Sequence, residues 1–325
     1  MANPDAPAIV SLRPTLQNYS WGRIGHESLV AKLAKSCFST LSYQSNGEKD
    51  KVTRTSNVVA ERSIQNEEGI GNFQISPDLP YAELWMGMHP RGTSVVYSPQ
   101  EPKTHHLQLD KYLAAVKAKI APIPYLLKVL SVAKPLSIQA HPDAKKAKEL
   151  FETNPDVYSD PNAKPEMTIA LGYLELLCGF RKLFEIAFFI ENIPELQRIL
   201  GEATMKSLGI TITQLSGEFV KECFSSTHDP SVLKSLFTSL LQCPNSIVQT
   251  ELNHLMNRLN LLRDSNTIPQ MDSRVYDACK LAQRLHSHFP GDVGVFCAFF
   301  LNFLRLEDGC GIFISANKLH AYIAG

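Results

Sequence analysis

The chain has 325 residues, 44% of them hydrophobic and 20% charged, which is an ordinary composition for a globular protein of about two domains. Lysine and arginine together number 32, as do aspartate and glutamate, so the net charge indicates neither nucleic acid nor an anionic membrane as a partner. No apolar run approaches the roughly 20 residues that a membrane-spanning helix needs.

The N-terminal segment and the cysteines predict a cytoplasmic protein. Residues 1–14 lack the basic start and the apolar core of a secretory signal. The seven cysteines are odd in number, scattered and free of CxxC spacing. That usage favours small buried thiols in a reducing compartment over disulfides or a thiolate zinc site.

Along the chain, a polar segment comes first and short β-type runs follow. Residues 42–72 hold few large apolar side chains and cannot offset their ordering entropy, so we expect a mobile polar insertion. Between about 77 and 181, the runs 94–97, 125–130 and 167–171 are separated by Pro, Gly and Asn. Short runs with frequent turn signals are typical of an all-β sandwich or barrel.

A helical period then replaces the β-type pattern. Apolar residues recur with helical spacing across 248–262 and across 275–285. Asp229 and Pro230 predict an N-cap and a first-turn proline for a helix that runs to Leu241. We therefore expect a domain of several amphipathic helices.

The β-type pattern returns after Phe289. Segments 295–297 and 311–315 are candidate strands, although the apolar stretch 296–304 also fits a buried helix. The helices are therefore inserted into a β domain, or at least flanked by β segments on both sides.

Polar side chains occupy every second position of the segment 135–142. In an extended strand, Ser137, Gln139 and His141 would share one face. A hydroxyl, an amide and an imidazole in a row suit a metal or sugar site. The solvated outer face of a strand produces the same pattern, so both interpretations stay open.

Two further segments carry matching chemistry. Lys164 and Glu166 also stand two apart, and Pro165 between them favours an extended backbone. With His320, the chain then offers two imidazoles, a carboxylate and an amide oxygen. Such a set suits a catalytic zinc ion or a non-haem iron, and residue types alone do not decide between them.

Eight segments, taken in chain order, resemble type I mannose-6-phosphate isomerase (phosphomannose isomerase), and together they cover nearly the whole chain. They are LQNYSWG at 16–22, YAELWMG at 81–87, PYLLKV at 124–129, SIQAHP at 137–142, NAKPEM at 162–167, LCGFR at 177–181, PGD at 290–292 and ANKLHAY at 316–322.

The resemblance implies a mainly β fold, a cupin-type jelly roll that is interrupted by a helical domain. It places the catalytic domain at 1–181, the helical domain at 182–289 and a return to the catalytic domain at 290–325. It implies one zinc ion per chain, in a cytoplasmic monomer. The residues that match the family's metal ligands are Gln139, His141, Glu166 and His320. The residues that match its substrate pocket are Trp21, Glu83, Lys128, Ser137 and Lys164.

The implied reaction interconverts mannose 6-phosphate and fructose 6-phosphate through an enediol and feeds GDP-mannose synthesis. Zinc suits this reaction because it polarises a carbonyl and stabilises an enediolate oxygen. Lys128 or Lys164 suits the phosphate dianion as a point charge. The base that moves the proton between C1 and C2 is not identified by the sequence.

The sequence departs from the family pattern in three places. Ser20 precedes Trp21 where the family usually has an acidic residue, and the segment 42–72 is longer than the family's connection. The chain also stops at Gly325, whereas full-length relatives continue with the rest of the jelly roll, a second one, and an arginine and an acidic residue of the active site. We therefore expect a truncated chain with weak zinc binding and little or no isomerase activity.

Two other functions stay open. One is a non-catalytic relative or fragment that binds sugar phosphates or a full-length partner. The other is a different metal cupin, such as an iron dioxygenase, which the glutamine ligand and the lysines disfavour. A coupled isomerase assay and a metal analysis separate the three.

Overall fold

The computed structural model describes residues 10–39, 73–97, 107–116, 123–201, 230–264 and 271–325. The polar segment 42–72 and Asp229 therefore lie outside the described residues. The chain divides into two compact units, residues 1–134 with 324–325 and residues 135–323, and each is described by itself. Within the described ranges, no helix combines the length and the apolar character that a membrane span requires.

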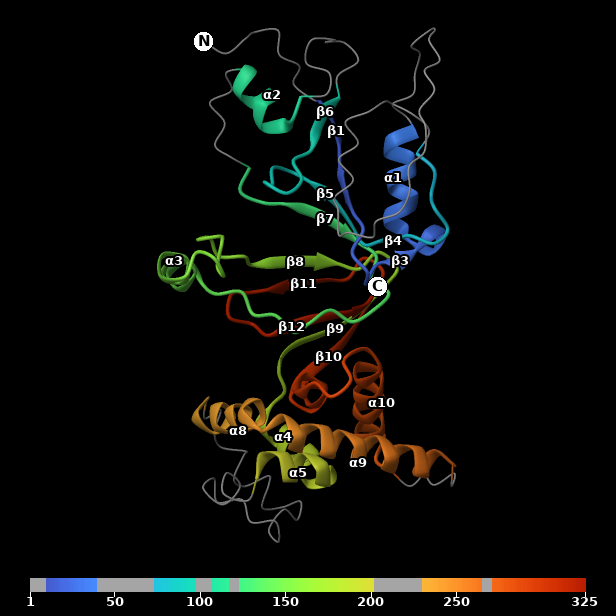
Figure 1. The fold of residues 1–325 in the computed structure, drawn as a ribbon, viewed down its shortest axis with the longest axis vertical. Coiled ribbons are helices and arrows are strands. Elements are labelled where there is room, and N and C mark those ends of the chain that lie inside the picture. The colour runs from blue at the N-terminus through green and yellow to red at the C-terminus, as the bar shows by residue number, and fades with distance from the viewer. Residues whose placement is uncertain (1–9, 40–72, 98–106, 117–122, 202–229, 265–270) are drawn as a thin grey trace. The chain divides into compact units, whose positions relative to one another are not determined.

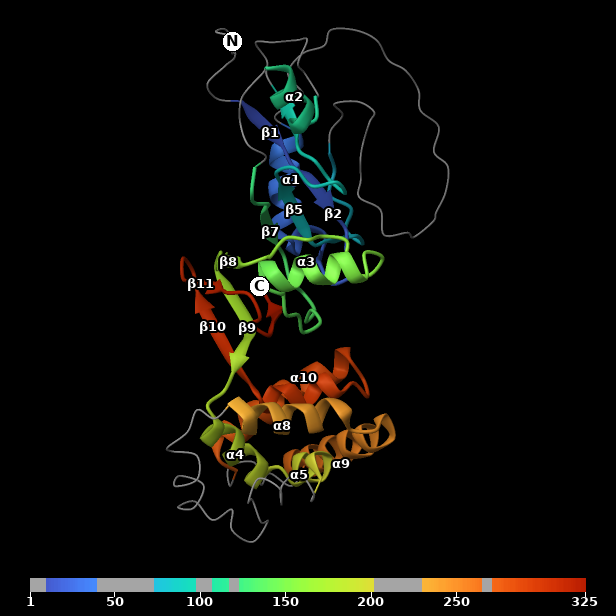
Figure 2. The same cartoon turned by 90° about the vertical axis from the view of Figure 1, so that its left-hand side faces the viewer.

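The first unit is built on a three-stranded antiparallel sheet with the order β2-β5-β7. Figure 1 labels β5 and β7, and Figure 2 labels all three strands. The register aligns Gln17 with Glu83, and Trp85 with Lys128. Two smaller antiparallel pairs, β1 with β6 and β3 with β4, complete its strands. The bounds are β1 Ser11–Arg13, β2 Thr15–Gln17, β3 Arg23–Ile24, β4 Pro80–Tyr81, β5 Glu83–Met86, β6 Val95–Tyr97 and β7 Leu127–Leu130.

The two faces of this sheet differ in chemistry because successive side chains of a strand point to opposite sides. Leu16 and Leu84 are buried on one face and belong to the same core as Val30 and Ala34 of helix α1 (Leu29–Ser39). The opposite face carries polar and aromatic side chains, namely Gln17, Glu83, Trp85 and Lys128. A second helix, α2 (Leu109–Ala115), packs on β6.

The β part of the second unit consists of two antiparallel sheets, β10-β9-β12 and β11-β8. Strand β9 ends where the helices begin, and β10 starts where they finish, with Phe180 paired to Leu301. The helices are thus inserted between two paired strands, which confirms that they are flanked by β structure. The bounds are β8 Glu166–Ile169, β9 Tyr173–Phe180, β10 Leu301–Glu307, β11 Gly311–Ile314 and β12 His320–Ala324.

The inserted helices form a bundle around one large core (Figure 2). Their apolar residues face inward at helical spacing, as Leu252, Leu255 and Leu259 of α9 show. The helices predicted over 230–241, 248–262 and 275–285 are confirmed. Their bounds are α4 Leu183–Asn192, α5 Pro194–Leu200, α8 Pro230–Gln242, α9 Asn245–Asp264 and α10 Ser273–His288.

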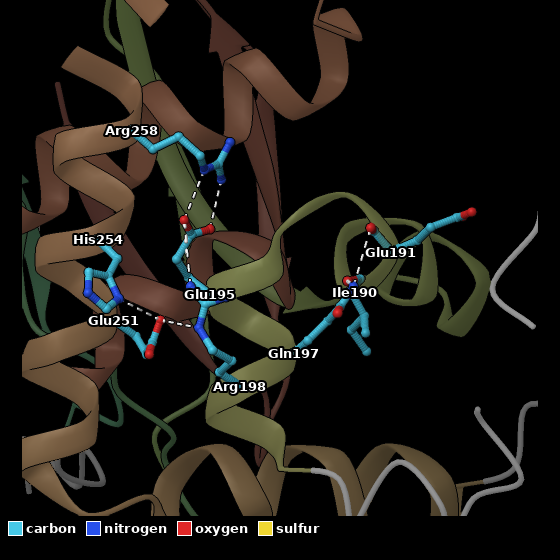
Figure 3. Close-up of polar contacts among 8 residues, drawn as sticks. All are labelled: Ile190, Glu191, Glu195, Gln197, Arg198, Glu251, His254 and Arg258. Carbon is cyan, nitrogen blue, oxygen red and sulfur yellow. Dashed lines mark hydrogen bonds and ion pairs between the residues drawn. The ribbon is translucent and has the colours of Figure 1, made fainter. Parts of the chain in front are cut away.

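A charged network joins α5 to α9 (Figure 3). Glu195 is only 3% exposed, and its two carboxylate oxygens accept hydrogen bonds of 2.9 and 2.8 Å from Arg258. Arg198 donates to Glu251 at 2.8 Å, and His254 lies 3.3 Å from the same carboxylate. Burial would raise the pKa of Glu195, but the hydrogen bonds and charge of Arg258, a backbone hydrogen bond and the charge of Arg198 together outweigh burial and lower that pKa.

Three expectations about the β segments need correction. Residues 295–297 are not a strand but part of a buried 3₁₀-helix, Val293–Phe299, whose first turn is capped by Asp292. All-round burial of this segment removes the alternation that marks a half-buried strand. The region expected to be all-β also contains α2 and α3 (Ala144–Thr153). The described strands form sheets of two or three strands and do not close into a barrel.

Candidate metal centre

Two stretches of backbone lie side by side and bring His141 near His320. The Gln139 amide donates to the His320 carbonyl at 2.8 Å, and the His320 amide donates back at 2.9 Å. The Asn317 amide donates to the His141 carbonyl at 2.7 Å. These bonds hold Asn317, in the turn between β11 and β12, and His320, the first residue of β12, against the segment 139–141.

The segment 135–142 is less regular than the strand that its sequence pattern predicts. Only an isolated antiparallel bridge, between Gln139 and His320, forms there. The prolines at both ends lack a backbone donor and cannot extend a ladder. Ser137 is exposed and Ile138 packs on the core as expected, but Ala140, which was expected inside, is exposed.

A tight turn before β12 fixes the position of His320. Asn317 adopts the left-handed conformation with φ of 62°, which asparagine tolerates better than most residues. Its side chain donates to Asp143 at 3.1 Å. Asp143 also accepts the Lys146 amide at 2.9 Å and caps α3. One carboxylate therefore ties the turn before His320 to the chain just after His141.

Three potential ligands converge at this point. The Nε2 atom of His141 lies 3.1 Å from Oε1 of Glu166, and the Nε2 atom of His320 lies 3.7 Å from Oε2. Ligand atoms of the three residues all lie within 4.8 Å of one another. Tetrahedral zinc, with ligands at about 2.1 Å, separates them by about 3.4 Å, so small side-chain shifts would suffice.

The protonation pattern of His320 fits a metal. This side chain is 1% exposed, and its Nδ1 atom lies 2.8 Å from the Lys318 carbonyl, to which it donates. The neutral ring then keeps a lone pair on Nε2, a buried atom that has no hydrogen-bond partner among the described residues. A buried lone pair without a hydrogen-bond donor destabilises the folded protein, and a bound cation would supply the missing partner.

The electrostatics of the cluster favour a positive charge. Burial would raise the pKa of Glu166, but its interactions with His320 and Tyr322 outweigh burial and lower the pKa to about 2. Glu166 in turn raises the pKa of His320, although burial opposes that shift. The ionised carboxylate thus attracts a cation, and a proton competes with a metal for the nitrogen of His320.

Gln139 is placed beside this cluster by its backbone. Residues that face each other in an antiparallel bridge direct their side chains to the same side, with Cβ atoms about 5 Å apart. Because Gln139 faces His320 in such a bridge, its amide is on the side of the cluster. Its role as a fourth ligand stays a prediction.

Two of the predicted substrate residues of the first unit, Glu83 and Lys128, lie together with Trp85 on its polar sheet face. Lys128 lies 3.2 Å from the carboxylate of Glu83 and 4.6 Å above the ring of Trp85. The Trp85 indole donates a hydrogen bond to the same carboxylate. Trp85 was missed by the sequence reasoning, although its spacing of two residues from Glu83 on a strand was a usable signal. Trp21 stacks on Tyr19 with ring centroids 5.8 Å apart.

The two predicted substrate residues of the second unit face solvent. Ser137 is exposed, and Lys164 forms an ion pair of 3.2 Å with Asp160. Both are therefore accessible to a ligand. The part that each of the five residues plays in binding a substrate stays a prediction.

Comparison with known proteins decides the family. Residues 55–183 match the model of the phosphomannose isomerase type I catalytic domain, and residues 199–301 match its helical insertion domain. The mannose-6-phosphate isomerase of Cryptococcus neoformans is 34% identical over 337 aligned residues, which cover 98% of this chain and 68% of that protein. The chain belongs to the type I phosphomannose isomerase family.

Other members of the type I phosphomannose isomerase family are similar at the same level. The mannose-6-phosphate isomerase of Schizosaccharomyces pombe is 33% identical over 97% of this chain and 65% of that protein. The chain thus spans about two thirds of the length of the curated relatives it matches. A mannose 6-phosphate isomerase of Salmonella typhimurium, solved with fructose 6-phosphate and zinc, shares the fold with a TM-score of 0.60 and 22% identity, over 98% of this chain and 66% of that one.

The phosphomannose isomerase resemblance did not single out the hydroxyl groups behind Glu166. Tyr322 donates a hydrogen bond of 2.8 Å to Glu166, and Thr168 lies 2.5 Å from the same phenol oxygen. Each hydroxyl residue stands two positions after a predicted ligand, Thr168 after Glu166 and Tyr322 after His320. Because residues two apart on a strand share one face, that spacing could have predicted that Thr168 and Tyr322 lie near the ligands.

Proposed function

We propose that this protein is a zinc-dependent aldose–ketose isomerase that interconverts mannose 6-phosphate and fructose 6-phosphate. The convergence of His141, Glu166 and His320 in a chain of this family carries the proposal. The name of the relatives and the sugar phosphate and zinc in the Salmonella structure support the substrate and the metal.

The reaction moves a carbonyl between C2 and C1 of the sugar and carries one carbon-bound proton and one hydroxyl proton the opposite way, so it needs no external oxidant. Bound zinc would polarise the substrate carbonyl and stabilise the negative charge of the enediolate. His141, Glu166 and His320 would hold one ion per chain, with Gln139 as the fourth ligand. Lys128 or Lys164 would hold the phosphate as a point charge.

The finer features implied by the family are part of the same proposal. They are a cupin-type jelly roll, the domain limits 1–181, 182–289 and 290–325, a cytoplasmic monomer, and a supply of mannose units for GDP-mannose synthesis.

A coupled assay of fructose 6-phosphate formation tests the proposal. The chain is stripped with a chelator, reloaded with zinc and compared with the Schizosaccharomyces pombe enzyme. We expect turnover that requires zinc and disappears in His141→Ala. The matched control is His288→Ala, which removes an exposed imidazole at the end of α10.

The outcomes separate the candidate functions. Binding of fructose 6-phosphate without turnover would favour a non-catalytic sugar-phosphate binder. A chain that binds neither zinc nor the sugar phosphate would refute both functions. Turnover equal to that of the yeast enzyme would refute the expected loss of activity and leave the isomerase function intact.

A further inference from the structure

Behind the metal cluster lies a chain of two hydroxyl groups that ends on Glu166. The phenol oxygen of Tyr322 is 2.8 Å from Oε2 of Glu166 and 2.5 Å from Oγ1 of Thr168. An ionised carboxylate only accepts hydrogen bonds, so the single phenol proton of Tyr322 is donated to Glu166. Thr168 must then donate its own proton to Tyr322. The direction of the chain is therefore fixed from Thr168 through Tyr322 to Glu166.

The two strands that carry these hydroxyl groups have the same arrangement of side chains. Glu166 and Thr168 stand two apart on β8 and share one face, and His320 and Tyr322 do so on β12. The strands belong to different sheets, β11-β8 and β10-β9-β12. The facing sides of the two sheets each supply one ligand candidate and one hydroxyl group.

The carboxylate of Glu166 is consequently engaged at both oxygens. Oε2 accepts from Tyr322, whereas Oε1 lies 3.1 Å from Nε2 of His141. Tyr322 is only 8% exposed, so water has little access with which to replace its hydroxyl group. A hydrogen bond to a charged acceptor at such a site is stronger than one between neutral groups.

We propose that Tyr322, held in turn by Thr168, is a positioning residue that fixes the carboxylate of Glu166 and leaves its Oε1 atom to the metal. The inference rests on the proposed function only in that this cluster binds zinc. The terminal torsion of a glutamate has a broad energy profile, so an unheld carboxylate rotates freely. Holding Oε2 in a hydrogen bond removes that freedom before the ion arrives.

The test removes each hydroxyl group alone. Zinc affinity is measured by competition with a chelator for the wild type and for Tyr322→Phe, which keeps the ring. We expect Tyr322→Phe to weaken zinc binding by about 10- to 100-fold, the usual effect of losing such a supporting contact. Thr168→Val should weaken binding less, and Thr168→Ser, which restores the hydroxyl group, should recover it.

Two further measurements exclude a purely structural effect. Tyr173→Phe is the matched control, because it removes a phenol hydroxyl on the neighbouring strand β9 that bonds to Glu175 instead. It should leave zinc affinity unchanged. The far-ultraviolet circular dichroism of the metal-free protein should be the same for the wild type and Tyr322→Phe within error.

Each other outcome counts against the inference. Unchanged zinc affinity in both Tyr322→Phe and Thr168→Val would overturn it while leaving the proposed function intact. A loss of the metal-free helical and sheet signal in parallel with zinc affinity would assign the hydroxyl group to the fold rather than to the ligand. A wild-type chain that binds no zinc would overturn both this inference and the proposed function.

Discussion

Replacing Glu195 by glutamine should destabilise the helical bundle by about 2 kcal/mol. Removing one partner of a fully buried ion pair costs about 3–5 kcal/mol, because the other charge is left without compensation. The side chain of Glu195 is 4% exposed, but that of Arg258 is 30% exposed, so water solvates part of the remaining guanidinium. The glutamine oxygen also keeps one hydrogen bond. Both effects reduce the expected loss below the fully buried value.

Thermal unfolding followed by far-ultraviolet circular dichroism measures this loss, since the helices dominate the signal. For a cooperative unit of 150–250 residues, 1 kcal/mol shifts the melting temperature by about 2–4 °C, so a decrease of about 4–8 °C is expected. The matched control is Glu191→Gln on α4, whose carboxylate forms no ion pair with any described residue. It should shift the melting temperature by less than about 2 °C, as surface substitutions usually do.

A double-mutant cycle with Arg258→Met identifies the cause. If the hydrogen bonds of Arg258 stabilise the bundle through Glu195, the second substitution costs much less in the background of the first. Strictly additive losses of stability would show that Glu195 and Arg258 do not stabilise the bundle through each other. Equal shifts of the melting temperature in Glu195→Gln and in the control would also contradict a stabilising role of the pair.

Three further outcomes follow from the described contacts. The loss of folding free energy in Glu195→Gln should shrink in acid. Arg258 keeps the pKa of Glu195 below its ordinary 4.5 despite burial, so the pair contributes fully to stability above pH 4.5 and loses that contribution as pH falls through the folded-state pKa. Denaturation curves of the wild type and the variant, recorded at neutral and at acid pH, measure this change. Leu252→Ala should lower the free energy of unfolding by about 2–5 kcal/mol in urea, whereas Leu261→Ala, at a side chain that is 70% exposed, should change it by less than about 0.5 kcal/mol. Zinc affinity should fall as pH decreases through the raised pKa of His320, because a proton then occupies the ligand nitrogen. Chelator competition across a pH series measures this, and a zinc affinity that does not change with pH would contradict it.

Periodicity located the helices and the strand at 311–315 well, but it was wrong about segment 295–297. The stripe from Val248 to Leu259 repeats at helical spacing because one side of α9 meets the core and the other meets water. Segment 295–297 has no such contrast, since its neighbours bury it on all sides. A one-dimensional pattern reports a contrast between two faces, and it carries no information where both faces are buried.

The spacing of two residues predicted which side chains of one strand share a face. Glu166 with Thr168, and His320 with Tyr322, obey that rule. It predicts nothing about which strands meet, because contacts between sheets depend on the path of the intervening chain. The hydrogen bond from Tyr322 to Glu166 spans more than 150 positions, and no local pattern contains it.

The family, the place of the inserted helices and the residue types of a metal site could be predicted from the amino-acid order, because these depend on local spacing and on segments that resemble known relatives. The convergence of His141, Glu166 and His320 within 4.8 Å, and the buried tyrosine that bonds to the carboxylate among them, became visible in the folded chain alone. Ligand convergence requires long-range backbone pairing, such as the bridge between Gln139 and His320. Its stability depends on the packing of the whole unit rather than on any segment.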